Sequence, residues 1–204
     1  FPSVSAAWKI HNEFELPDFI TSLKLRGGWG EVGNQEIGNY LFQRTVNRGI
    51  PYQFSGGPTV IGSAVTQLID EDIRWETRRT SSIGLDASLF NGGLDFTAEY
   101  YRNTSEDVLV NIPVPFTNIV GAFNSEILSN AGSIRNSGIE LSAVYRQFIG
   151  DDFSFEIAPN FYTVKNEILD IGNQDFISGT GSRNMVGRSL GEHYGWGYDG
   201  IFQT

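Results

Sequence analysis

The chain has 204 residues, of which 40% are hydrophobic and 13% aromatic, and its formal net charge is -10. Its 15 Phe, 8 Tyr and 4 Trp side chains require burial against protein or lipid, which excludes a disordered tail. The acidic balance excludes nucleic acid as a partner, and the absence of Cys excludes disulfide frameworks and thiolate metal sites. No apolar run reaches the roughly 18 residues of a membrane helix, but a barrel of alternating strands stays open.

The first eight residues contain no basic segment followed by an apolar one, so they do not form a signal peptide, and we expect an interior piece of a longer protein. Apolar residues then alternate with other residues at positions 4 to 10 and 23 to 30, which predicts two strands. Residues 12 to 22 read as a connecting turn. Residues 31 to 76 are mostly aperiodic and predict a long loop, with a short strand near residues 40 to 46.

A hairpin is indicated on both sides of Asn91-Gly92, where apolar and polar residues alternate before and after the turn. A type I′ turn at Asn91-Gly92 pairs Leu89 with Leu94, whereas a turn one residue later pairs Leu89 with Phe96. Both registers keep the apolar faces together. A three-residue loop would turn one strand over, so we expect an even-numbered loop.

A second hairpin is predicted further along the chain, because alternation stops before residues 147 to 151 and resumes after them. The two apolar sets require an odd-numbered loop, and a loop over residues 147 to 151 places Arg146 opposite Asp152. Pro159 falls inside the second strand, where it cannot donate to the ladder, so we expect a bulge there.

Connections of two kinds alternate along the chain. The two hairpin turns are short, whereas three segments are long: residues 31 to 76, 105 to 137 and 165 to 192. The strands expected at residues 77 to 89 and 94 to 104 are as long as the 9 to 11 tilted residues that cross a bilayer, or longer. This plan is typical of a transmembrane β-barrel with short turns at one end and long loops at the other.

Five strings of the sequence, in order, resemble the barrel of the SusC/RagA-type TonB-dependent outer-membrane transporters of Bacteroidetes. They are FPSVSAAW (1–8), LKLRGGWGEVGNQEIGNY (23–40), DIRWETRRTSSIGLDASLF (72–90), NAGSIRNSGIELS (130–142) and YDGIFQT (198–204). The resemblance covers nearly the whole chain.

The resemblance implies a fold and a cellular setting. It implies an all-β, antiparallel transmembrane β-barrel of 22 strands in the outer membrane, plugged by an N-terminal domain. It also implies a SusD-like surface lipoprotein as partner, an oligosaccharide or peptide substrate, and energy supplied through TonB. We expect residues 1 to 204 to form a partial barrel of six or seven strands with long extracellular loops and short periplasmic turns. The plug and the other N-terminal domains are expected outside this chain.

No catalytic, cofactor-binding or metal-binding residue is predicted, and no substrate-binding residue can be assigned. An acidic cluster lacks the spacing of a calcium loop and reads as a solvated loop: Asp70, Glu71, Asp72 and Glu76. His11 and His193 are isolated. The glycines of a GxGxxG string, Gly28, Gly30 and Gly33, precede no helix and are expected to allow bending or close backbone approach.

Glycoside hydrolysis needs a pair of carboxyl groups at a defined separation. Three glutamates on polar strand faces could supply such pairs, but no spacing singles out one: Glu99, Glu140 and Glu156. We therefore expect no enzyme.

Two sets of aromatic residues have different predicted roles. Those near strand ends are expected in an interfacial girdle: Trp8, Phe90, Tyr101, Phe148 and Phe153. Those near long-loop ends could stack on sugars, but a girdle or loop-packing role is favoured: Trp75, Tyr194, Trp196 and Tyr198.

The leading hypothesis is a barrel segment of a nutrient transporter with apolar residues facing lipid. Six charged residues are expected to face the lumen: Lys24, Arg26, Asp86, Glu99, Glu140 and Arg146. The alternative is a soluble, secreted β-sandwich that binds carbohydrate, in which the same alternation buries a core between two sheets.

Overall fold

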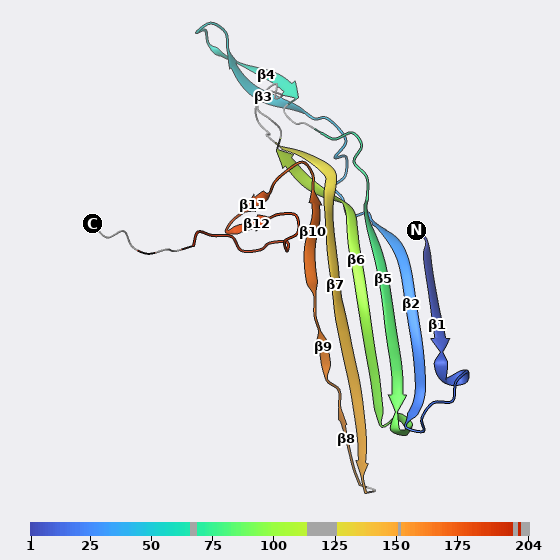
Figure 1. Cartoon of the computed structure of the whole chain (residues 1–204). Helices are drawn as coiled ribbons and strands as arrows, with labels where there is room; N and C mark the ends of the chain where they lie inside the picture. The colour runs from blue at the N-terminus through green and yellow to red at the C-terminus, as the bar shows by residue number, and fades with distance from the viewer. Residues whose placement is uncertain (66–68, 114–125, 151, 198–199, 201–204) are drawn as a thin grey trace.

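The computed structural model describes residues 1–65, 69–113, 126–150, 152–197 and 200, and these form an antiparallel all-β structure (Figure 1). The main sheet has the strand order β1-β2-β5-β6-β7-β10, and β8 and β9 also pair with β7. Its strands are β1 (Ser3–Lys9), β2 (Ile20–Asn34), β5 (Glu76–Leu89), β6 (Leu94–Pro113), β7 (Glu126–Ile149), β8 (Phe153–Ile157), β9 (Asn160–Tyr162) and β10 (Lys165–Ile171). Among the described residues, no helix is long and apolar enough to cross a membrane.

The three short strands after β7 follow one another along the same edge of β7 and together take the place of one strand in the sheet. β8, β9 and β10 pair with β7 one after another in a constant register, until a shift between Ile168 and Asp170. The sheet therefore has six strand positions side by side (Figure 1), within the six or seven that were predicted. Its described part is open, with β1 at one edge and the β8–β10 row at the other.

The first hairpin has the register that a turn at Asn91-Gly92 predicts. Leu89 pairs with Leu94, and the N–H of Gly93 donates to the carbonyl oxygen of Phe90 at 3.1 Å. Asn91 and Gly92 have φ angles of 55° and 86°, as the two central residues of a type I′ turn require. A short 3-10 turn, η2 (Phe90–Gly92), covers these residues.

The second hairpin has an odd-numbered loop, but the loop is shorter than expected. Ile149 pairs with Phe153, so Arg146 lies opposite Glu156 and the predicted pairing with Asp152 is wrong. Alternation fixes whether a loop is odd or even and leaves its length open. Gly150, at a φ of 66°, allows the chain to turn sooner.

The predicted bulge at Pro159 is also wrong. The register is the same on both sides of this residue, so the strand is interrupted without being shifted. Proline removes one N–H from the ladder, yet its carbonyl oxygen still accepts a hydrogen bond from the N–H of Ala143 at 3.1 Å.

The long connections contain more structure than expected. The strand predicted near residues 40 to 46 is instead a turn, in which the N–H of Gln43 donates to the carbonyl of Tyr40. A projecting hairpin follows, made of β3 (Val46–Gln53) and β4 (Thr59–Val65) (Figure 1). The segment predicted as a loop at residues 105 to 137 belongs largely to β6 and β7, and residues 114–125 lie outside the described part.

The predicted loop at residues 165 to 192 begins with β10 and includes the small hairpin of β11 (Ile177–Gly179) and β12 (Ser182–Asn184). A neighbouring segment covers the edge of β10, because Ile168 exchanges backbone hydrogen bonds with Gly187 and Arg188. Of the apolar residues in the described part, only Ile168 and Ile171 are fully buried, at 1% and 4% exposure. The sheet therefore has almost no core of its own.

Candidate functional site

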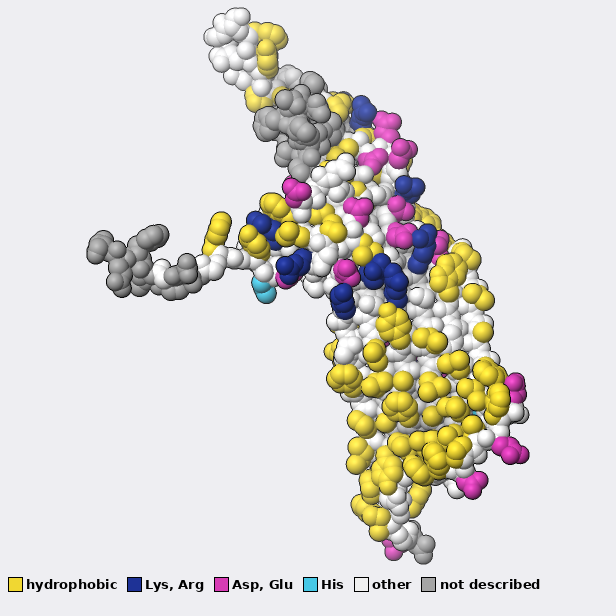
Figure 2. Space-filling model, in the orientation of Figure 1, with side chains coloured by type: hydrophobic (Ala, Val, Ile, Leu, Met, Phe, Trp, Pro, Cys, Tyr) yellow, Lys and Arg dark blue, Asp and Glu magenta, His cyan; other side chains and the backbone are white. Residues whose placement is uncertain are grey.

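The outer face of the sheet is an exposed apolar surface. Rows of residues that the ladders place opposite one another include Leu25, Leu85, Ala98, Leu141 and Phe161. Exposure reaches 54% at Ile83, 48% at Tyr100 and 46% at Ile139 in the next row. A β-sandwich would bury this face under a second sheet, so the sandwich alternative is wrong for the described chain. Figure 2 shows apolar side chains over the half of the sheet that ends in the short turns.

Aromatic side chains gather on the short-turn end of the outer face. Trp8 contacts Phe14 and Phe19 contacts Phe90, with ring centroids 5.9 and 6.1 Å apart. Phe155 lies within 6.2 Å of both Tyr145 and Phe153. Trp8, Phe90 and Phe153 thus lie where a girdle residue is expected.

Two of the predicted girdle residues fall on the other side of the alternation. Tyr101 lies on the inner face, with its hydroxyl over Gly138, so its assignment to the girdle is wrong. Phe148 lies at the short-turn end and pairs with Ser154. Its side chain points to the inner face, whereas that of Tyr145 points to the outer face. Position near a strand end does not reveal which face a residue occupies.

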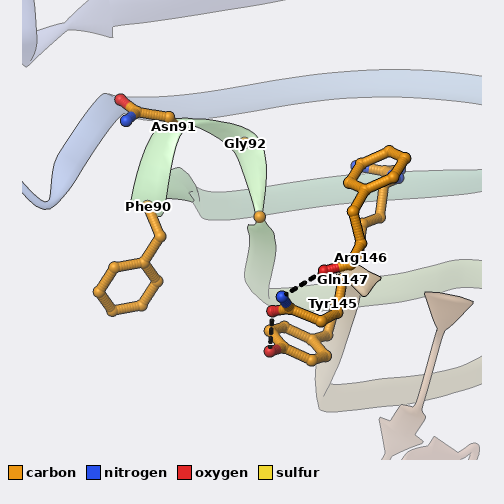
Figure 3. A pocket seen from close by; sticks show the side chains of 8 residues that line it. Phe90, Asn91, Gly92, Tyr145, Arg146 and Gln147 are labelled. Atoms are coloured by element: carbon orange, nitrogen blue, oxygen red, sulfur yellow. Dashed lines mark hydrogen bonds between the residues drawn. The ribbon is translucent and has the colours of Figure 1, made fainter. Parts of the chain in front are cut away.

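The short-turn end also has a hollow of about 490 Å³ between the β5–β6 turn and the end of β7 (Figure 3). The hydroxyl of Tyr145 donates to Oε1 of Gln147 at 2.7 Å, and the amide of Gln147 donates to the carbonyl of Phe148. The N–H of Arg146 donates to the carbonyl of Gly93 at 2.8 Å. The last of these bonds joins the end of β7 to the β5–β6 turn, and the other two lie within β7.

The inner face carries the six charged residues that the sequence assigned to the lumen, and five of them are joined by ion pairs. Nζ of Lys24 lies 3.0 Å from Asp86, and Nε of Arg26 lies 3.3 Å from the same carboxylate. Nη2 of Arg26 also reaches Glu99 at 2.5 Å. Nearer the short turns, Arg146 contacts Asp95 at 2.6 Å and Glu156 at 2.8 Å.

A glycine on β5 makes the ion pair between Arg26 and Glu99 possible. Arg26 is on β2 and Glu99 is on β6, so the guanidinium must cross β5, which lies between them. The residue of β5 in that row is Gly84, and a Cβ there would lie 2.8 Å from Cζ of Arg26. A side chain at Gly84 would therefore displace the guanidinium of Arg26 from its path to Glu99.

The ion-pair network borders a hollow of about 380 Å³ on the inner face. Its lining is mostly polar: Arg26, Thr97, Glu99, Glu140, Leu141, Ser142, Asn160, Phe161 and Tyr162. Glu140 lies opposite Glu99 in the register but forms no ion pair within the described ranges. This surface offers hydrogen-bond donors, acceptors and one unpaired carboxylate.

A second hollow, of about 880 Å³, lies at the long-loop end between residues 35 to 42 and residues 73 to 75. The loop that forms it is fastened to the sheet by Asn130 on β7. The side-chain amide of Asn130 donates to the carbonyl of Arg74 at 2.8 Å and accepts from the N–H of the same residue. Trp75, half exposed, lines this hollow, so the choice between loop packing and stacking on a sugar stays a prediction.

The acidic cluster is divided among separate partners. Asp70 accepts from the hydroxyl of Ser129 at 2.5 Å, which holds the pKa of Asp70 below its usual value, with a further contribution from the N–H of Asp72. Glu71 pairs with Arg44 at 2.8 Å, and Glu76 accepts from Asn34. Within the described residues, no group of three or more potential ligands could hold a metal ion.

The glycines of the GxGxxG string and the two histidines make local structural contacts. Gly28, Gly30 and Gly33 lie in β2, where a Cβ at Gly33 would come within 2.5 Å of the Phe1 ring. A side chain at Gly33 would therefore displace the Phe1 ring, which is exposed. His11 accepts from the N–H of Leu23 at 3.2 Å, and His193 forms an isolated bridge with Ser182.

The aromatic residues after β12 differ in how far they are covered. Tyr194 stacks on the guanidinium of Arg183 at 3.6 Å, and Phe176 covers the same group at 4.0 Å. Trp196 is 96% exposed, and Tyr198 lies outside the described residues. Stacking within the segment thus occupies Tyr194.

Comparison with known proteins identifies relatives of one kind. Residues 1–202 match the family described as TonB dependent receptor-like, beta-barrel. The chain is 33% identical to a TonB-dependent receptor of Formosa agariphila over all of this chain and 19% of that protein. It is 32% identical to the TonB-dependent receptor SusC of Bacteroides thetaiotaomicron over 86% of this chain and 18% of that protein.

Solved structures agree. The chain is similar to the structure of the RagAB peptide transporter, with a TM-score of 0.74 and 27% identity over 91% of this chain and 20% of that one. The 'open-open' state of the RagAB peptide importer gives a TM-score of 0.77 and 26% identity over the same shares. The chain thus spans about a fifth of the length of these relatives.

Proposed function

The chain belongs to the family of TonB-dependent receptor-like β-barrels, and on that premise we propose that it forms part of the wall of an outer-membrane active transporter. Residues 1 to 204 supply a barrel segment, while the plug and the TonB-binding parts lie elsewhere in the longer protein. The segment performs no bond chemistry. The observation that carries the proposal is the division of one sheet into an apolar outer face and an ion-paired inner face.

The substrate is proposed to be an oligosaccharide or a peptide that enters with the help of a SusD-like lipoprotein. Support comes from relatives named SusC and RagAB, the second of which is titled a peptide transporter. The two hollows on the inner face and at the long-loop end offer polar groups and aromatic surface to such a molecule.

Adjacent residues of β7 provide a test of the two faces. In the full-length parent protein in whole cells, Ser142→Cys is expected to react with a charged maleimide, and Leu141→Cys only with a lipid-soluble one. Both residues lie in the same stretch of β7 and point to opposite faces, so each is the control for the other. Equal labelling of both by the charged reagent would contradict the proposed wall.

Transport is tested by uptake in cells that carry or lack the parent gene. Accumulation of a labelled oligosaccharide or a labelled peptide pool that requires both this gene and TonB would support the proposal and identify the substrate class. Loss of the gene without effect on either pool, under conditions in which the protein is present in the membrane, would contradict the transport role.

A further inference from the structure

The outer face changes from apolar to charged between consecutive outward rows. On β7 the outward positions run from Ile139 to Ile149, apolar except for Gln147. Ten steps of about 3.3 Å along this stretch, tilted by about 40°, give a height of about 25 Å, the apolar height of outer-membrane barrels. The next outward residue of β7 toward the long loops is Ser137, which therefore lies just beyond the apolar band.

Two basic side chains flank Ser137 in its row. The ladders place Arg102 of β6 on one side and Lys165 of β10 on the other, about 10 Å apart across two strand spacings. Arg135 is the next outward residue of β7. We call these four residues, Arg102, Arg135, Ser137 and Lys165, the basic patch. Figure 2 shows Lys and Arg side chains gathered directly beside the apolar region.

Two of the three cations of the basic patch, Arg102 and Arg135, form no ion pair with a described residue. Arg102 is exposed and has no ion pair or side-chain hydrogen bond with any described residue, and Nε of Arg135 is buried without a partner. Among the described residues, Lys165 has a single ion pair, to Glu167 at 3.4 Å, and its side chain remains 74% exposed. The patch with Glu167 thus has a net charge of about +2, within a chain of net charge -10.

The neighbouring Arg79 shows what an internally satisfied cation looks like at the same height. Its guanidinium contacts Glu31 at 3.0 Å and Glu106 at 2.6 Å. Arg79 lies in the same outward row as Arg135, so position alone does not leave a cation unpaired.

We propose that the basic patch binds the phosphate group of a lipid in the membrane leaflet on the long-loop side. The acyl chains of that lipid would lie on Tyr100 and Ile139, one row deeper, while its phosphate accepts from Arg102, Lys165 and the hydroxyl of Ser137. A guanidinium and an ammonium together suit a phosphate that carries more than one oxygen acceptor. The inference rests on the proposed membrane orientation.

The test uses the full-length parent protein in nanodiscs of phosphatidylcholine, with diphosphorylated lipid A as the probe. Native mass spectrometry counts the lipid A molecules that stay bound after detergent release. The double variant Arg102→Gln/Lys165→Gln is expected to bind lipid A about 25-fold more weakly, since each basic residue near an anionic lipid surface contributes a factor of about five. Each single variant, Arg102→Gln or Lys165→Gln, should weaken lipid A binding by a factor of about five.

The matched control is Arg78→Gln, which removes one exposed arginine from the inner face of the adjoining strand β5. Arg78 also has no ion pair among the described residues, so the variant changes the net charge without touching the basic patch. Its lipid A binding is expected to equal that of the parent. Equal loss in Arg78→Gln and Arg102→Gln would show a general charge effect and overturn the inference, as would unchanged binding in the double variant.

Two further arms separate the possible outcomes. Millimolar inorganic phosphate should not displace lipid A, because the acyl chains contribute; full displacement would identify a free-phosphate site and overturn the lipid assignment. Failure of the parent to enter nanodiscs would contradict the proposed function itself. Insertion with no difference among the variants contradicts only the lipid site.

Discussion

The outer and inner faces of the sheet share one backbone ladder and differ in what satisfies their side chains. On the outer face, Ile83 is exposed and Leu85 is half-buried, and in the proposed barrel wall lipid would cover both. On the inner face, Arg26 reaches across a strand to Glu99, and Lys24 and Arg26 share one carboxylate. Substitutions on the two faces should therefore fail for different reasons.

The difference teaches where the stability of such a segment resides. Only two apolar residues of the described chain are fully buried, so burial within the sheet contributes little. In the proposed barrel, transfer of the outer face into lipid, at about 25 cal/mol per Å² of apolar surface, would replace the missing core. The inner network fixes the relative positions of the strands and adds little hydrophobic stabilisation.

The largest expected effect breaks the outer face. Leu85→Arg places a charge near the middle of the apolar band and is expected to destabilise the full-length barrel by about 2 to 4 kcal/mol. Ser142→Arg, on the inner face beside the unpaired Glu140, is the control and should cost less than about 1 kcal/mol. Urea unfolding and refolding in lipid vesicles measures both. Equal losses would show that the faces are assigned wrongly.

The next largest loss of stability is expected where a glycine allows a close backbone contact on the inner face. A Cβ at Gly138 would collide with the backbone carbonyl of Thr163, which lies between β9 and β10 and is held against β7 by the hydrogen bond from its N–H to Ile139, so Gly138→Ala is expected to cost about 2 kcal/mol.

Gly28→Ala is the matched control for that change, because Gly28 lies in the same inner row as Gly138. A Cβ at Gly28 would meet Ser5 and Val4 at an ordinary 3.8 Å, and the expected cost is below about 1 kcal/mol. The same urea titration compares the two variants. A larger loss for Gly28→Ala than for Gly138→Ala would contradict the contact geometry.

A smaller effect separates a paired from an unpaired carboxylate within one row. Glu99→Gln removes the charge that Arg26 contacts at 2.5 Å and is expected to cost about 1 kcal/mol. Glu140→Gln, directly opposite on β7, removes a carboxylate without a described partner and should change stability by less than about 0.5 kcal/mol. Differential scanning calorimetry of the full-length protein in detergent compares the melting temperatures of the two variants. A larger loss for Glu140→Gln than for Glu99→Gln would contradict the ion-pair network.

The sequence predicted the parts of this architecture that depend on alternation. The two faces and the six inner charges follow from a period of two, and the observed pairing of Leu89 with Leu94 is one of the two registers that the sequence left open. Arg146 was assigned to the correct face with the wrong partner, because a loop shortened by two residues keeps the face and changes the opposite residue.

Features that depend on contacts between distant segments could not be predicted. In the sequence Gly84 is only a residue of low strand propensity, because its contact with Arg26 comes from another strand. No sequence pattern near Gly138 indicates that the carbonyl of Thr163 lies against it. Asn130 fastens a loop that is 56 residues away in sequence. Glycines at inward positions of long strands were the one available signal, since a glycine in a strand interior often marks close approach.

The smallest effect locates where the two-face pattern ends. Beyond the register shifts of β6 and β7, Ser129 holds the loop residue Asp70, whose pKa is lowered first by that hydroxyl and then by the N–H of Asp72. Because the folded pKa lies below the unfolded value of about 3.9, this contribution is complete above that pH and disappears as the pH falls through the folded pKa. Hydrogen exchange of residues 69 to 75 should therefore speed up at acidic pH in the parent, after correction for intrinsic rates, and should not change in this way in Asp70→Asn. Thus an acid-dependent loss that persists in Asp70→Asn would assign the loop's attachment to another group.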